Sequence, residues 1–525
     1  MSLETSKQIE SLDSDLFRRF EQLGAFQAYE YLDGDKGARE ATKKAFLSGE
    51  VRNPTLDYPN LSKWLRGEIG SPAMTVAARE QALLQLKRDA EVSSLPEAAK
   101  MAYKWRLNEK IAELRMMKAV DAGDMTAFGR YNAFVYGVPS ESVFKYSVRQ
   151  IEASVAGTTD PQQQAAGKDL LALLPNADAI TTPDESKRSI EPWSIVIKQQ
   201  FDTITPPAEA AVAEARQRIW ESMGVLADLL KRTHAENKDY DAPQIKSLFD
   251  EALDLLKAEG WNVQIATDSK TGISVHQESK TVKIPAARKV NSAKLAGLIA
   301  HEIGIHVGRR VRGERSQLQL LALGLDRYEG GEEGVTTQAE KVIEGKPITE
   351  FSGLEAHLAI SLARGCGLKD QPRDFRDVYE VLYRHFYCQK LPAFQKKLAD
   401  IDNKKAQLAA LNETEENMPQ ITALQQAISE LTKVDPTEAL IKESQDAAWN
   451  RSVRTFRGTD CKTPGVCFTK DMIYREGQIG TWDITKMDPN QMVTFSVGKF
   501  DPNDPRHLWV LQQLKITDQD LGEAA

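Results

Sequence analysis

The 525-residue sequence has few cysteines and no long apolar run. Its four cysteines, Cys366, Cys388, Cys461 and Cys467, are too few for a disulfide framework in so long a chain, and their spacing fits no four-cysteine zinc module. We expect free thiols; a disulfide or a metal pair formed by Cys461 and Cys467 is the alternative. No apolar stretch approaches the ~18 residues that cross a bilayer, which argues against an integral membrane protein.

The sequence also lacks a strong excess of one charge. Lys and Arg total 68 against 76 Asp and Glu, a formal net charge of -8, so a general nucleic-acid-coating role is disfavoured. The first 20 residues contain neither the basic start nor the apolar stretch of a secretory signal. We therefore expect a cytoplasmic protein with no nucleic-acid or membrane partner.

Helical periodicity dominates the rest of the chain and predicts a predominantly helical α+β fold. Composition changes suggest five segments. These are a helical N-terminal region (1–154), a polar linker (155–206), a core region (207–390), a charged helical-hairpin insertion (391–445) and a C-terminal part of the core (446–525).

Residues 261–286 alternate apolar and polar positions between turn-forming stretches, which predicts a small antiparallel sheet. Asn262–Ile265 and Thr281–Ile284 are candidate edge strands for an extended peptide, although a purely structural sheet explains them equally well. Asn291 or Ser292 then caps a helix, AKLAGLIAHEIGIHVG, that is apolar on nearly all faces and is predicted to be buried beside the sheet.

This buried helix carries the segment HEIGIH, which contains His301, Glu302 and His306. Buried imidazoles and a carboxylate are costly unless something satisfies them, and a divalent metal does this well. The usual helical zinc pair has histidines four residues apart; a separation of five leaves them about 140° apart on a regular helix. Gly304 can accept a widened π-turn that realigns them, so we predict a distorted helix. Separate core histidines are the alternative.

A third ligand is expected from YEGGEEGVTTQAEKVIEG, where Glu332 and Glu333 open another helix. Acidic residues are common at helix N-termini without any metal, so either glutamate alone is weak support. Two histidines, one glutamate and an open position nevertheless form the ligand set of a catalytic zinc. Glu340, on the same helix face, could hydrogen-bond a ligand from behind.

Three ordered blocks resemble a known family. They are HEIGIHVGRR, RSQLQLLALGLDRYEGGEEGVTTQAE and RTFRGTDCKTPGVCFTKDMIYREG, with weaker matches in NPTLDYPN and SVGKFDPNDPRHLWVLQQL. Together they resemble the microtubule-associated tyrosine carboxypeptidases and their bacterial relatives, which are described by a QEGLA motif. The likeness spans most of the chain apart from residues 391–445. Val335-Thr336 replaces the Leu-Ala of that motif, and Ile305 replaces a threonine of the tubulin enzymes.

The resemblance implies a zinc peptidase in which His301, His306 and Glu333 hold Zn²⁺, because Glu333 directly precedes the glycine shared by the EEG and QEG versions. Glu332 is the alternative ligand. Glu302 is the expected general base. The third block is expected to line the pocket, and it supplies the candidates for oxyanion stabilisation and for binding a terminal carboxylate: Tyr474, Arg454, Arg457 and Lys470.

We therefore expect a zinc carboxypeptidase that releases a C-terminal residue, with tyrosine the leading guess, from a protein or peptide. One alternative is an endopeptidase with the same metal site and an open cleft. The other is a non-catalytic regulatory or binding protein with a metal site, although retention of Glu302 argues against it, since a structural site needs no base.

Overall fold

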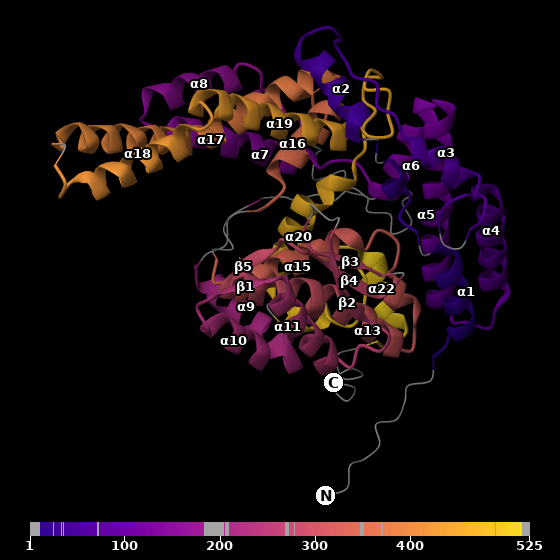
Figure 1. The fold of residues 1–525 in the computed structure, drawn as a ribbon. Helices are drawn as coiled ribbons and strands as arrows, with labels where there is room; N and C mark the ends of the chain where they lie inside the picture. The colour runs from indigo at the N-terminus through magenta and orange to yellow at the C-terminus, as the bar shows by residue number, and fades with distance from the viewer. Residues whose placement is uncertain are drawn as a thin grey trace, which may run out of the picture.

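The computed structural model describes most of the chain. The described residues are 11–24, 26–32, 34, 36–70, 73–182, 204, 209–267, 272–277, 279–346, 351–368, 371–412, 414–488 and 490–516. Figure 1 shows a small core region with the strands near its centre, a group of N-terminal helices beside it, and a long layer of helices above both.

The described N-terminal part is helical, as predicted, and local signals set many of its helix ends. Asp124 accepts a hydrogen bond from Ala127 N to start α6, and Gly123, at φ 68°, ends α5. The elements are α1 (Ser14–Gly24), η1 (Ala28–Leu32), α2 (Lys36–Leu47), α3 (Pro59–Leu65), α4 (Val76–Val92), α5 (Glu97–Ala122), α6 (Met125–Tyr136), α7 (Glu141–Gly157), α8 (Pro161–Leu171) and η2 (Ala177–Ala179). The last part of α7, α8 and η2 lie in the predicted linker, most of whose remaining residues are outside the described ones.

The core region begins with helices that pack around two small sheets. A capping box between Asp241 and Gln244 starts α11. The elements are α9 (Glu209–Ser222), η4 (Gly224–Leu226), α10 (Ala227–Ala235), β1 (Asp239–Asp241), α11 (Ala242–Leu255), β2 (Asn262–Ala266), β3 (Ser274–His276), β4 (Thr281–Pro285) and β5 (Lys289–Asn291).

The predicted antiparallel sheet is only partly antiparallel. β3 pairs antiparallel with β4, and β1 with β5, but β2 pairs with β4 in parallel, in the order β2-β4-β3. The candidate edge Thr281–Ile284 is wrong, because β4 is the central strand. Alternation of apolar and polar residues predicts strands but does not determine which strands pair. Here β2 pairs with β4, although β3 lies between them in the sequence. The predominantly helical α+β class is confirmed.

The predicted buried helix runs without a break from Ser292 to Arg315. Asn291 caps it through a hydrogen bond from Lys294 N. It consists of α12 (Ser292–Leu298), a π-helical segment η5 (Ile299–Val307) and α13 (Gly308–Arg315). The widened turns coincide with HEIGIH, so the predicted distortion is confirmed.

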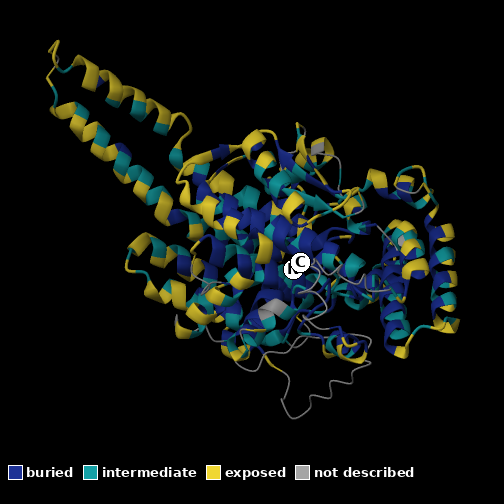
Figure 2. Cartoon of the chain, turned by 90° about the horizontal axis from the view of Figure 1, so that it is seen from below, coloured by how far each residue is buried: buried dark blue, intermediate teal, exposed yellow. Residues whose placement is uncertain are grey.

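The remaining elements complete the core and the upper layer. Ile401 and Ile421 are buried between α17 and α18, which form a projecting arm, residues 398–432, whose surface is mostly exposed or half-buried (Figures 1 and 2). The elements are α14 (Leu320–Leu323), α15 (Glu329–Ile343), α16 (Leu354–Arg364), α17 (Phe375–Ala410), α18 (Met418–Thr432), α19 (Pro436–Phe456), η6 (Lys470–Met472), α20 (Ile473–Met487), α21 (Gln491–Thr494) and α22 (Pro505–Gln513).

Two buried apolar clusters cross the predicted segment boundaries. The larger joins N-terminal helices to the core region and the C-terminal helices; the smaller joins α2, α7 and α8 to α16, α17 and α19. The division into five segments stays a prediction. All four cysteines are free thiols, as predicted. Among the described helices, none combines the length and the apolar character needed to cross a bilayer.

Candidate functional site

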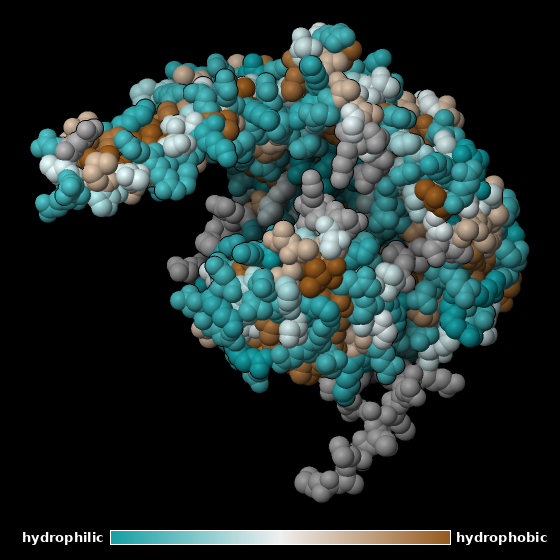
Figure 3. All heavy atoms as spheres, viewed as in Figure 1, coloured by the Kyte–Doolittle hydropathy of each residue, from teal (hydrophilic) through white to brown (hydrophobic). Residues whose placement is uncertain are grey.

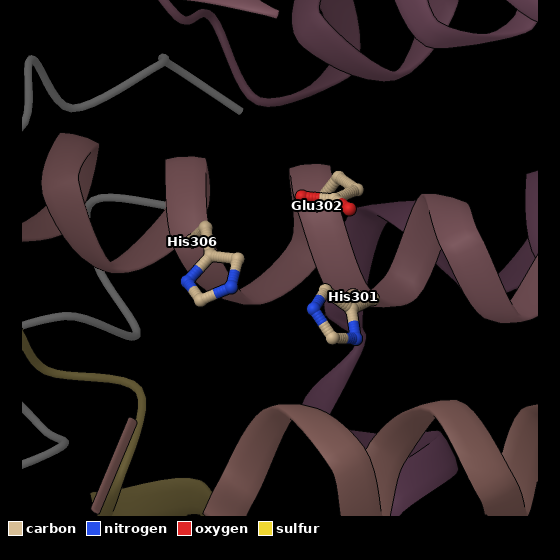
Figure 4. Close-up of side chains that lie close together, drawn as sticks. All are labelled: His301, Glu302 and His306. Atoms are coloured by element: carbon tan, nitrogen blue, oxygen red, sulfur yellow. The ribbon is translucent and has the colours of Figure 1, made fainter. Parts of the chain in front are cut away.

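The π-helical segment brings the side chains of HEIGIH together. One ligand atom from each of His301, Glu302 and His306 lies within 4.8 Å of the others. The two imidazole centroids are 5.1 Å apart, and Figure 4 shows both rings on the same side of the helix. Because a π-helix bonds residue i to i+5, it places on one face two side chains that a regular helix would separate.

Carboxylates from α15 hold both imidazole rings. Nδ1 of His301 lies 2.6 Å from Glu340 Oε2, and Nδ1 of His306 lies 2.6 Å from Glu332 Oε1. An ionised carboxylate accepts a hydrogen bond from Nδ1–H, so in the neutral ring Nε2 carries no proton and is available to a metal ion. Glu340 therefore occupies the supporting position expected for it, and Glu332 occupies the corresponding position behind the second histidine.

Glu332 is fully engaged in this supporting role. It is buried, its Oε1 also accepts a hydrogen bond from Lys499 Nζ at 2.7 Å, and its Oε2 lies 3.5 Å from Arg309 Nη1. Burial by itself raises the pKa of Glu332, but Lys499 and His306 outweigh it and lower that pKa. Glu332 is therefore an ionised carboxylate whose oxygens are occupied by Lys499, Arg309 and His306.

Glu333, the next residue of α15, is half-buried and is not part of the group formed by His301, Glu302 and His306. Its charge affects the pKa of both His301 and Glu302. Burial by itself lowers the pKa of His301, but Glu302, Glu340 and Glu333 outweigh it and raise that pKa to about 9. Burial raises the pKa of Glu302, partly countered by His301 and His306. A raised carboxyl pKa is the property that a general base needs near neutral pH.

The third sequence block contributes Tyr474 and Lys470 to this neighbourhood. The charge of Glu333 and then burial raise the pKa of Tyr474, so its hydroxyl stays protonated and can donate a hydrogen bond. Lys470 is buried and ion-paired with Glu329. Burial alone lowers the pKa of Lys470, but Glu329, Tyr474 and Glu333 outweigh it and raise that pKa. Both predicted residues therefore lie close to Glu333.

The two predicted arginines occupy different environments. Arg454 is 49% exposed at its side chain and binds Asp471 with two hydrogen bonds, of 2.7 and 2.9 Å. Arg457 is buried between the rings of Tyr29 and Phe468, with its Cζ 5.1 and 4.4 Å from the two centroids. Neither arginine is among the main charges that shift the pKa of Glu302 or His301.

The N-terminal helices close over this part of the core. A cavity of about 50 Å³ is lined by Phe26 and Lys110 from the N-terminal region and by Gln277, Tyr328 and Lys499 from the core and tail. Lys110 also donates to Phe26 O at 2.8 Å. This cavity lies at the junction between the N-terminal region and the core region, and it reaches Lys499, which holds Glu332, but His301, Glu302 and His306 do not line it.

The residues present fit a catalytic zinc. The cluster combines two imidazoles, each oriented by a carboxylate, with the adjacent Glu302. Glu333, which lies outside this cluster, would have to supply the third ligand atom. Oriented imidazoles with a carboxylate ligand are the donors that zinc prefers in hydrolytic sites.

Sequence reasoning missed Lys499 and Arg309 as the residues that hold Glu332. Both lie in segments quoted for the family likeness, HVGRR and SVGKFDPNDP, but nothing local indicated that they meet. Tyr29 and Phe468 were missed for the same reason. Lys499 and Tyr29 contact residues more than 100 positions away along the chain, whereas Arg309 lies 23 residues from Glu332, and Phe468 is in the same sequence block as Arg457. Periodicity reveals none of these contacts.

Comparison with known families supports the likeness found in the sequence. Residues 200–384 match the family model of the microtubule-associated tyrosine carboxypeptidases, which confirms the resemblance for the part of the chain that carries HEIGIH and α15. Searches of curated proteins and of solved structures gave no match. The matched stretch ends before Arg454, Arg457, Lys470 and Tyr474. The family is one of carboxypeptidases, so the match indicates an enzyme of the peptidase class.

Proposed function

We propose that this protein is a zinc-dependent carboxypeptidase that releases the C-terminal residue of a protein or peptide. The observation that carries the proposal is the π-helical HEIGIH segment, where His301, Glu302 and His306 converge and separate carboxylates orient the two rings. The family match supports the reaction class, and by its name it makes tyrosine the first candidate for the released residue.

His301, His306 and Glu333 would hold the zinc ion. When bound there, zinc lowers the pKa of a water molecule to roughly 7 and polarises the scissile carbonyl. The assignment of Glu333 rests on two contrasts with Glu332: Glu333 acts electrostatically on His301 and Glu302, whereas Glu332 is bonded to His306 and Lys499.

Glu302 is the proposed general base. It takes a proton from the attacking water as the oxygen bonds to the carbonyl carbon, and it returns that proton to the amine nitrogen as the C–N bond breaks. Tyr474, which keeps its proton, is positioned near Glu333 to donate a hydrogen bond to the carbonyl oxygen as negative charge develops there.

Mass spectrometry of peptides tests this proposal directly. Zinc-loaded wild-type protein is incubated with peptides that differ only in the C-terminal residue, and intact masses are read with time. We expect loss of one terminal residue by the wild type and a rate at least about 100-fold lower for Glu302→Gln, which should still bind zinc. His306→Ala should lose both zinc and activity.

The matched control is Glu91→Gln, the same change at an exposed position of α4. It should cleave like the wild type. Internal cleavage products would favour the endopeptidase alternative. Normal turnover by Glu302→Gln would show that the assigned base is wrong, and a wild type that binds zinc yet cleaves no peptide would count against the proposed reaction.

A further inference from the structure

Arg457 is a buried guanidinium that lacks a bonded anion. The residue is 8% exposed, and it forms no hydrogen bond or ion pair with any residue in the described part of the chain. Its Nε is completely buried without a partner. Burying an unpaired charge is costly, so such a group is normally paired or reserved for a ligand.

The other two candidate cations are already paired. Arg454 binds both oxygens of Asp471, and Lys470 is ion-paired with Glu329. Burial raises the pKa of Asp471, whereas the charges of Arg454 and then of Arg457 lower it. The oxygens of Asp471 nevertheless accept their hydrogen bonds from Arg451 and Arg454.

Two aromatic rings flank the Arg457 guanidinium. Tyr29 and Phe468 lie at 5.1 and 4.4 Å from its Cζ. A guanidinium held against aromatic rings can still donate hydrogen bonds, and its planar fork matches a carboxylate with two parallel hydrogen bonds. We call Arg457, Tyr29 and Phe468 the Arg457 cradle.

The backbone around the cradle is tied to distant parts of the chain. Gly458 N donates a hydrogen bond to Tyr58 Oη at 2.7 Å, and Phe468 N donates to Thr455 O at 2.8 Å. Both contacts hold the ends of the Arg457-to-Phe468 segment, which fixes the backbone from which the guanidinium projects.

The cradle adjoins the metal-binding residues through Lys470. Lys470 Nζ lies 4.8 Å from the centroid of the same Tyr29 ring that Arg457 contacts. Lys470 in turn feels the charges of Glu333 and Tyr474. An anion on Arg457 would therefore lie on the Tyr29 side of the site, beyond Lys470.

We infer that Arg457 in its cradle is the receptor for the C-terminal carboxylate of the peptide, with Tyr29 of the N-terminal region as one wall of that receptor. This inference rests on the proposed function for its ligand. It makes Arg457 a specificity-determining residue, and it requires the N-terminal helical region for recognition of a free chain end.

Binding measurements separate this inference from catalysis. The probes are fluorescein-labelled hexapeptides ending in tyrosine, one with a free carboxylate and one with a C-terminal amide. Fluorescence anisotropy is measured on zinc-loaded, full-length Glu302→Gln protein, which should not consume the probe. We expect at least about tenfold tighter binding of the free acid than of the amide, as for a charge-assisted pair.

Adding Arg457→Gln should remove that preference while leaving amide affinity and zinc content unchanged. The matched control is Arg130→Gln, which removes an arginine from over the Tyr131 ring at an exposed position of α6 and should keep the preference. If Arg457→Gln does not fold, Arg457→Lys is measured instead. It keeps the charge but not the planar fork, and it should show a reduced preference.

An acid preference that persists undiminished in the Arg457 variant, or that is absent from the parent protein, would overturn the inference. The proposed function can fail independently of it. If the wild type cleaves no peptide but binds the free acid through Arg457, the receptor inference stands and the proposed function fails. If it cleaves peptides but its acid preference does not depend on Arg457, the proposed function stands and the receptor inference fails.

Discussion

At the residue scale, two adjacent glutamates of α15 have opposite surroundings. Glu332 is bonded to His306 and Lys499, and Glu333 acts on His301 and Glu302. Consecutive helical residues point about 100° apart, so neighbours in sequence serve different sides of the site. One supports a histidine from behind, and the other is the residue that we propose as the third metal ligand.

This contrast predicts crossed effects of two matched variants. Glu333→Gln should lower zinc affinity by more than the 10–100-fold typical of a supporting residue, with little change in the stability of metal-free protein. Glu332→Gln should lower zinc affinity within that range. It should also cost roughly 3 kcal/mol of unfolding free energy, because Lys499 and Arg309 lose a buried partner.

Zinc affinity is measured by competition with a chelator, and stability by urea unfolding in EDTA. The reverse pattern, with the larger loss of zinc in Glu332→Gln, would make Glu332 the ligand.

At the scale of the elements, the site depends on a very close crossing of α15 and α20. A Cβ added to Gly334 would overlap the carbonyl oxygen of Gly477, and one added to Gly477 would overlap that of Gly330. Glycine at these positions lets the two backbones meet. The crossing places Glu333, on α15, near Tyr474, on α20.

We therefore predict that Gly334→Ala separates the two helices. It should destabilise the protein by about 1–3 kcal/mol, as overpacking does, and lower peptide hydrolysis by moving Glu333 relative to Tyr474. Thermal unfolding and the mass assay check both effects. Gly157→Ala, at the end of α7 with nothing within 4 Å of the new Cβ, is the control and should change neither. An unaltered Gly334→Ala enzyme would mean that the crossing can relax.

At the scale of the whole molecule, the arm stands apart from the site. α18 packs against α17, and Figure 3 shows small apolar patches on the arm within a largely polar face. The site is built from η5, α15, η6 and α20 together with η1 of the N-terminal region. The arm contributes none of these residues.

Replacing residues 398–432 with a short Gly-Ser linker should therefore leave peptide hydrolysis within about twofold of wild type, because closing a short loop costs little. The linker keeps Gln395, whose side chain bonds Asp160 and Gln163 of the α8 segment. Initial rates in the mass assay, with circular dichroism as a folding check, test this. A folded but inactive variant would make the arm part of the catalytic machinery.

The amino-acid sequence by itself determined the helical character of the chain, the free thiols and the π-distortion at HEIGIH. These follow from local rules: periodicity reports which face is buried, and five-residue spacing of His301 and His306 forces a widened turn if they are to share a metal. The cap at Asn291 could also be predicted, because a capping side chain bonds the backbone only three residues away.

Only the tertiary structure decided which partners these residues take. The parallel pairing of β2 with β4, the contact of Lys499 with Glu332 and the position of Tyr29 over Arg457 each join segments separated along the chain. Such contacts depend on how whole elements pack, because burial and charge pairing act through space and not along the sequence. The sequence offered three cations for a carboxylate, and packing left one of them, Arg457, without a bonded anion among the described residues.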